Sequence, residues 1–91
     1  MIRLVKMCFQ EEHISLFKEI FKASQSKIEN MPGCLKVDLH QEINEKNTFF
    51  TISHWESEED LENYRKSELF ISTWKKVKPL FKVKAEAWSL N

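Results

Sequence analysis

Glycine and proline are scarce in this sequence, which has one glycine, Gly33, and two prolines, Pro32 and Pro79, among 91 residues. Loops that hold nucleotide phosphates need several glycines, so this composition excludes the P-loop and the dinucleotide-binding fingerprint. No repeat or low-complexity stretch divides the chain. The sequence therefore predicts long regular elements with short connections, in one domain spanning residues 1–91.

Cysteine and histidine are almost as rare, and their spacing fits no metal motif. Cys8 and Cys34 form no CxxC pair, and His13, His40 and His54 form neither HxH nor HExxH, so we expect no metal site. Small folds that lack disulfides and metals commonly gain stability by oligomerisation. These absences favour a homo-oligomer.

Long apolar runs and an excess of one charge are also missing. Arg3 and Lys6 interrupt the apolar N-terminal stretch, which argues against a signal peptide, and no segment approaches the roughly 20 apolar residues of a membrane span. The 14 basic and 14 acidic residues cancel, so no overall positive field attracts nucleic acid. We expect a cytoplasmic protein with neither a membrane nor a nucleic-acid partner.

Four segments have the residue pattern of strands. Leu35, Val37 and Leu39 alternate with polar residues, as in a strand with one buried face. After the polar loop Asn44–Asn47, β-branched and aromatic residues dominate. Strands are therefore predicted over residues 2–9, 34–43, 48–56 and 81–90.

Helical spacing fills the remaining segments. Apolar residues recur at three- and four-residue steps over residues 11–30, and Met31-Pro32-Gly33 ends this predicted helix. Ser57 and Ser67 are candidate N-caps for two shorter helices, which run to about Arg65 and about Lys78.

This order of elements predicts an α+β fold of the ferredoxin-like split βαβ kind. Right-handed crossovers give a four-stranded antiparallel sheet in the order 4-1-3-2, with helices on one face. The third strand then separates Cys8 from Cys34 by about 9.5 Å, beyond disulfide reach. The bare face carries Trp88 or Trp55, so we expect a homodimer that packs sheet against sheet.

A family resemblance begins at Pro32-Gly33-Cys34-Leu35 and extends over nearly the whole chain. Its most specific part is the run from Phe49 to Glu59, followed by Tyr64, Ser67, Phe70 and Trp74. These residues resemble the antibiotic biosynthesis monooxygenase (ABM) domain family. The resemblance implies a dimeric α+β barrel with a pocket between helices and sheet. It also implies oxidation of aromatic polyketides without a metal or flavin cofactor.

The chain departs from two groups within that family. Haem-degrading members have an Asn on the first strand, a Trp on the short helix and a His on the next helix. Here no Asn precedes Asn30, and Tyr64 and Trp74 occupy the other two positions. Many further members have a His at the position of Tyr64 and a Glu near Ser53. The resemblance therefore does not imply haem degradation.

Aromatic residues on the two short helices are the first candidates for a site. Tyr64 is a candidate catalytic residue because its phenol can donate or accept a hydrogen bond beside a bound ring. Phe70 and Trp74 lie one helical turn apart and are candidates for a substrate-binding wall, together with Trp55 and His40. The alternative is that these aromatic residues only fill the core.

The second candidate is a carboxylate–imidazole dyad across the predicted hairpin. If the loop spans Glu45 to Asn47, Asp38 lies opposite His54 with their Cβ atoms about 5 Å apart. The carboxylate could then raise the basicity of His54, which could take a proton from a phenolic substrate. A loop longer by one residue places Val37 opposite His54 and removes the dyad.

The leading functional hypothesis is a cofactor-independent monooxygenase of the ABM type that acts on a small aromatic or quinone-like compound. One alternative is a non-catalytic dimer that binds a small ligand or serves a stress response. Another is an isomerase or small-carbonyl enzyme on the same fold, because a fold alone does not determine a reaction.

Overall fold

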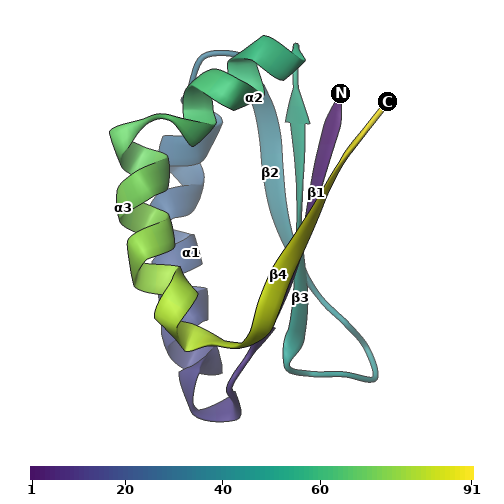
Figure 1. Ribbon diagram of the computed structural model, residues 1–91, viewed down its shortest axis with the longest axis vertical. Coiled ribbons are helices and arrows are strands. Elements are labelled where there is room, and N and C mark those ends of the chain that lie inside the picture. Colours follow the sequence, from purple (N-terminus) through teal and green to yellow (C-terminus); the bar gives the residue numbers. More distant parts are fainter.

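The computed structural model describes residues 1–91 and confirms the predicted order of strands and helices. Figure 1 shows the helices together on one side of a twisted sheet, with both chain termini at the same end. None of these helices has the length and apolar character needed to cross a bilayer. The elements are β1 (Ile2–Phe9), α1 (Ile14–Glu29), β2 (Cys34–Gln41), β3 (Thr48–Trp55), α2 (Glu58–Arg65), α3 (Glu68–Val77) and β4 (Phe81–Leu90), with short 3₁₀ turns at Glu11–His13 and Lys78–Leu80.

The sheet is antiparallel throughout and has the order β2-β3-β1-β4, which confirms the predicted ferredoxin-like topology. β3 lies between the strands that carry the cysteines. Cys8 pairs with Thr48 at one end of β3, whereas Cys34 pairs with Trp55 at the other end. The topology therefore keeps the two thiols at opposite ends of the sheet as well as on separate strands.

The core forms where α1 crosses the lower half of the sheet. The ring of Phe9 stacks on Phe17 at 4.0 Å between centroids, and Phe49 meets both rings edge-on. Met7 on β1, Val77 on α3 and Leu80 in the following turn complete this buried cluster. The predicted inward face of the long helix is confirmed, because the spacing of apolar residues matches the helical period.

Hydrogen bonds at the helix starts explain where α2 and α3 begin. The Ser57 hydroxyl accepts a bond from the Asp60 N–H at 3.1 Å, and the Ser67 hydroxyl accepts one from the Phe70 N–H at 3.2 Å. Both predicted N-caps are confirmed. Gly33 has φ of +81°, and a Cβ at this position would overlap the Asp60 side chain. Gly33 thus allows the start of α2 to lie against the start of β2.

Local irregularities in β2 and β4 correct the simple alternation expected from sequence. The pairing of β2 with β3 shifts between Cys34 and Lys36, which leaves Leu35 largely exposed rather than inward. The pairing of β4 with β1 also shifts, and Val83 is exposed. A bulge inserts an extra residue and reverses the facing of its neighbours, so periodicity alone misassigns them.

The sheet face away from the helices carries a row of apolar side chains. Leu4 pairs with Ile52 on one side and with Trp88 on the other, so the three side chains share this face. Met7 on β1 points the opposite way and is buried under the helices. Trp55 is also buried, with 1% of its surface exposed, whereas Trp88 is 41% exposed. Trp88 is therefore the tryptophan on this open face.

Candidate functional site

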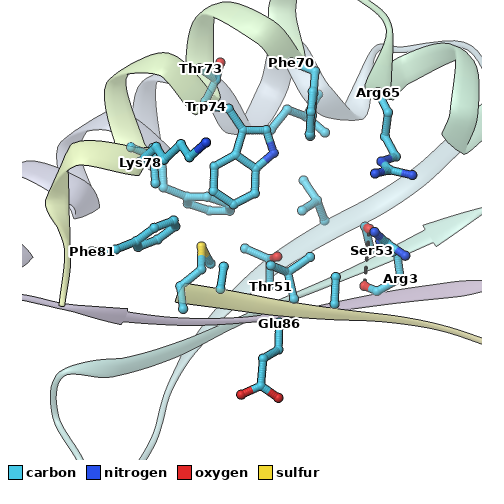
Figure 2. Close-up of a pocket in the computed structure, with 18 of the residues that line it drawn as sticks. Arg3, Thr51, Ser53, Arg65, Phe70, Thr73, Trp74, Lys78, Phe81 and Glu86 are labelled. Atoms are coloured by element: carbon cyan, nitrogen blue, oxygen red, sulfur yellow. Dashed lines mark hydrogen bonds between the residues drawn. The ribbon is translucent and has the colours of Figure 1, made fainter. Parts of the chain in front are cut away.

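A cavity of about 1040 Å³ lies between the helix-covered face of the sheet and helices α2 and α3. Most of the residues that line it are hydrophobic, as in sites for small organic ligands. Consecutive β4 residues from Lys82 to Ala87 line it although their side chains alternate between faces, so the cavity opens over the edge of β4. Figure 2 shows this space enclosed by α3 above and the strands below.

The wall of the cavity is a continuous series of aromatic rings. Trp55 stacks on Tyr64 at 5.1 Å between centroids, and the edge-to-face contacts of Phe70 follow at 5.2 Å to Tyr64 and 5.8 Å to Trp74. Phe81 continues the series at 5.6 Å from Trp74. The structure therefore brings together four of the predicted residues, Tyr64, Phe70, Trp74 and Trp55, around one cavity.

Tyr64 is mostly buried in the cavity wall, and its hydroxyl is not a buried polar group left without a partner. Burial raises the pKa of Tyr64 to about 12, with a smaller contribution from Cys34. The phenol is therefore protonated at neutral pH and can donate a hydrogen bond.

Polar groups on the floor of the cavity are fixed by a short chain of hydrogen bonds. The indole Nε1–H of Trp55 donates to the hydroxyl of Ser53 at 2.9 Å, and this hydroxyl donates to the carbonyl of Arg3 at 3.4 Å. Figure 2 shows the second of these bonds beside the Arg3 side chain. These contacts connect β3 to β1 and hold Trp55 rigidly behind Tyr64.

The remaining predicted residues, His54, Asp38 and His40, lie on the other face of the sheet. Ser53 and Trp55 face the cavity, so His54 between them faces away, and Asp38 and His40 share its face by pairing with Ile52 and Phe50. None of the three lines the cavity. They are therefore separated from the aromatic wall by the thickness of the sheet.

The predicted Asp38–His54 dyad is wrong because the hairpin has a different register from either alternative. Lys36 lies opposite His54, and Val37 lies opposite Ser53. The carboxylate of Asp38 instead approaches the ammonium of Lys36, at 3.2 Å on the same strand.

Asn47 connects the end of the hairpin loop to β1. Its side-chain amide donates to the carbonyl of Phe9 at 2.8 Å, and its own carbonyl accepts from the Phe9 N–H at 2.9 Å. The end of β1 thus fixes where β3 begins, and the Glu42 N–H then reaches the Thr48 carbonyl at 2.9 Å. The contact between Asn47 and Phe9, 38 residues apart in sequence, thus connects the hairpin to β1.

Sequence reasoning missed the polar residues of the cavity. Arg3 and Ser53 project from the sheet, whereas Arg65 and Thr73 project from the helices. The one available signal was composition, because Arg3 and Arg65 are the only arginines in the chain. Nothing in the local pattern indicated that the fold brings them to one cavity.

The chain is a ferredoxin-like α+β domain with an aromatic cavity between its helices and its sheet. The sequence matches the antibiotic biosynthesis monooxygenase family over residues 1–76, so the chain belongs to that family. The predicted resemblance is confirmed. Comparison with curated protein sequences gives no significant match.

Solved structures confirm the fold. The protein Rv0793 from Mycobacterium tuberculosis superposes with a TM-score of 0.90 at 14% identity, covering 99% of this chain and 91% of its own. A conserved protein from Methanosarcina mazei Go1 superposes with a TM-score of 0.89 at 19% identity, and the match covers 96% of this chain and 87% of that protein. A protein described as an antibiotic biosynthesis monooxygenase superposes with a TM-score of 0.90 at 16% identity, and the match covers 100% of this chain and 97% of that protein. At these identities the similarity establishes architecture alone.

Proposed function

We propose that this protein is a cofactor-independent monooxygenase that oxidises a small aromatic or quinone-like compound in the cavity of the helix-covered face. The observation that supports it is the phenol of Tyr64, which lines an aromatic cavity and stays protonated at neutral pH because burial raises its pKa to about 12. Family membership is consistent with this reaction. A flat apolar ring fits against Phe70 and Trp74, because aromatic pairs are favourable in offset or edge-to-face geometry.

The chemistry draws its electrons from the substrate. An anthrone-type substrate loses a proton from its ring methylene, and the resulting carbanion transfers electrons to O₂ and forms a C–O bond. Protonation gives a hydroperoxide, which loses water to leave a carbonyl group. One oxygen atom of O₂ enters the product and the other leaves as water, so the four-electron oxidation of the carbon balances the four-electron reduction of O₂.

Tyr64 is assigned the role of hydrogen-bond donor in this reaction rather than that of base. Deprotonation of an anthrone places negative charge on the ring oxygen, and a protonated phenol directed at this oxygen stabilises that charge. His54 and Asp38 lie on the opposite face of the sheet, so the released proton goes to water that enters over the β4 edge. This assignment replaces the base predicted from sequence.

Oxygen consumption on addition of anthrone tests the proposal. The wild-type protein should consume one O₂ per anthrone and form anthraquinone, and Tyr64→Phe should lower the rate by about tenfold, as expected for loss of one donor. His54→Ala should leave the rate within about twofold. Oxygen consumption no faster than in buffer, across anthrones and naphthohydroquinones, contradicts the proposed reaction.

A non-catalytic ligand-binding protein is the second candidate, and one observation favours it. No histidine or carboxylate directed at the cavity is available to take a proton, because Glu86, the one acidic residue near the lining, points away from it in Figure 2. Calorimetry separates the two candidates, since tight binding of anthraquinone without oxygen consumption by anthrone identifies a binding protein.

The open face supports a second proposal, that two copies pack sheet against sheet as a homodimer. Leu4, Ile52 and Trp88 form a contiguous apolar row there, and Leu90 pairs with Ile2 at its end. Contiguous apolar surface of this kind marks association sites. A two-fold axis through the row would place the same residues on both sides.

A further inference from the structure

The only two arginines of the chain, Arg3 and Arg65, lie at the same end of the cavity. Arg3 projects from β1 on the floor, whereas Arg65 is the last residue of α2. Figure 2 shows both guanidinium groups at the end next to Ser53, on the far side of Trp74 from Phe81. The other 12 of the 14 basic residues are all lysines.

Neither guanidinium group is fully neutralised by the protein. Arg65 contacts the carboxylate of Glu62 through a single nitrogen at 3.3 Å, and Arg3 donates to the hydroxyl of Ser89 at 3.1 Å. No carboxylate lies within ion-pair distance of Arg3. Burial lowers the pKa of Arg3, and the charge of Arg65 lowers it further, against a smaller opposite effect of Glu62. The two cations therefore repel each other in a site that partly excludes water.

The whole cavity shares this excess of positive charge. Its lining includes five cations, Arg3, Arg65, Lys78, Lys82 and Lys84, and one anion, Glu86; Lys82, Lys84 and Glu86 all lie on β4, along the edge over which the cavity opens. The chain as a whole has a formal net charge of zero. The positive charge is thus concentrated where a ligand would enter, and a cleft lined by one sign of charge attracts ligands of the opposite sign.

We propose that the ligand carries a carboxylate that binds between Arg3 and Arg65 while its aromatic ring lies against Phe70 and Trp74. Arginine is suited to this role because its planar fork can donate two parallel hydrogen bonds to one carboxylate, whereas lysine acts as a point charge. The inference rests on the proposed function, since it specifies the substrate class of the same cavity: aromatic acids rather than neutral aromatic compounds.

A matched pair of probes isolates the carboxylate. 2-Naphthoate and 2-naphthamide have nearly the same shape and differ in charge, and their dissociation constants can be measured by calorimetry at pH 7 and low salt. The wild-type protein should bind naphthoate at least about tenfold more tightly than naphthamide, as expected for charge-assisted hydrogen bonds. Equal affinities would overturn the proposal.

Variants then assign the preference to the two arginines. Arg3→Gln and Arg65→Gln should each weaken naphthoate binding by about tenfold or more and change naphthamide binding by less than about twofold. Arg3→Lys should restore part of the naphthoate affinity, because it keeps the charge but loses the fork. Lys46→Gln removes the same charge from the distant hairpin loop and should have no effect on either probe.

The outcomes distinguish this inference from the proposed reaction. A naphthoate preference that persists unchanged in both arginine variants overturns the carboxylate site while leaving an aromatic cavity. A preference that depends on both arginines, in a protein that consumes no oxygen with hydroxynaphthoates or anthrone carboxylates, supports the site and contradicts the oxygenase reaction. If neither naphthoate nor naphthamide binds, both the carboxylate site and the proposed reaction are contradicted. Thermal unfolding of each variant confirms that it remains folded.

Discussion

The two faces of the same sheet have opposite characters, although their residues alternate along the same strands. On β3, Thr51 and Ser53 face the cavity, whereas Phe50 and Ile52 face away from the helices. The covered face thus has polar groups among aromatic rings, and the open face has an apolar row with histidines at its margin. Because neighbouring residues face opposite sides, a shift of one residue in register would exchange the two functions.

Under the two proposals, this contrast separates binding of a ligand from binding of a second copy. A small-ligand site needs a few polar groups within an apolar enclosure, as around Tyr64. A stable interface between copies needs contiguous apolar area, as around Leu4. Substitutions on one face should therefore leave the property of the other face largely intact, and the following predictions test that separation.

Ile52→Glu should have the largest effect, because it places a carboxylate at the centre of the proposed dimer surface on both copies. We expect the dimer dissociation constant to rise at least about a hundredfold, since an unpaired buried charge is strongly unfavourable. Sedimentation velocity measures it. Ile43→Glu is the control, since Ile43 lies in the hairpin loop and is 89% exposed. A wild-type chain that remains monomeric at all concentrations would contradict the prediction.

Gly33→Ala should have the next largest effect. The positive φ of Gly33 and its closeness to Asp60 leave no space for a methyl group. The free energy of unfolding should fall by about 1–3 kcal/mol, as measured by urea denaturation at fixed protein concentration. Asn44→Ala in the exposed hairpin loop is the control and should change stability by less than about 0.5 kcal/mol. Equal stability of Gly33→Ala and wild type would show that α2 does not depend on this contact.

Tyr64→Phe should lower ligand affinity without changing the free energy of unfolding. Its hydroxyl is not a buried group left unpaired, so the free energy of unfolding should stay within about 0.5 kcal/mol of wild type when it is removed. Affinity for a ring-oxygen-bearing ligand such as anthraquinone should fall by about tenfold for the loss of one hydrogen bond. His54→Ala, on the open face, should not alter this affinity. Loss of affinity in His54→Ala but not in Tyr64→Phe would place the ligand on the open face.

The smallest expected effect is that of pH, within the neutral range, on the stability contributed by Tyr64. Tyr64 is the only tyrosine, and its pKa of about 12 in the folded protein lies above the value of about 10 in an unfolded chain. Its stabilising contribution is therefore complete below about pH 10 and is lost as pH rises toward 12. Ultraviolet titration should show no tyrosinate below about pH 11. Tyrosinate appearing near pH 10 would mean that the phenol is fully hydrated.

Periodicity and capping residues were sufficient to predict the fold. Ser57 and Ser67 mark the starts of α2 and α3 by accepting hydrogen bonds from residues three positions later, and the positive φ of Gly33 ends the connection after α1. Strand order followed from the handedness of crossovers, which is a general constraint. Local rules therefore accounted for the elements and their topology.

The site was only half predictable, because part of it depends on contacts between distant residues. The aromatic wall follows from helical spacing and was predicted. The hairpin register places Lys36 rather than Asp38 opposite His54, and the loop length that sets this register could not be read from the sequence. The two arginines are 62 positions apart, from residue 3 to residue 65, and only the folded sheet and α2 bring them to one cavity.

A crystal structure of the protein with bound 2-naphthoate tests the central claim most directly. The account predicts the naphthalene ring between α3 and the sheet, against Trp74, with its carboxylate between Arg3 and Arg65. The apolar row around Leu4 should be covered by a second copy. A ring bound instead on the open face beside His54 would contradict the assignment of ligand and partner to opposite faces.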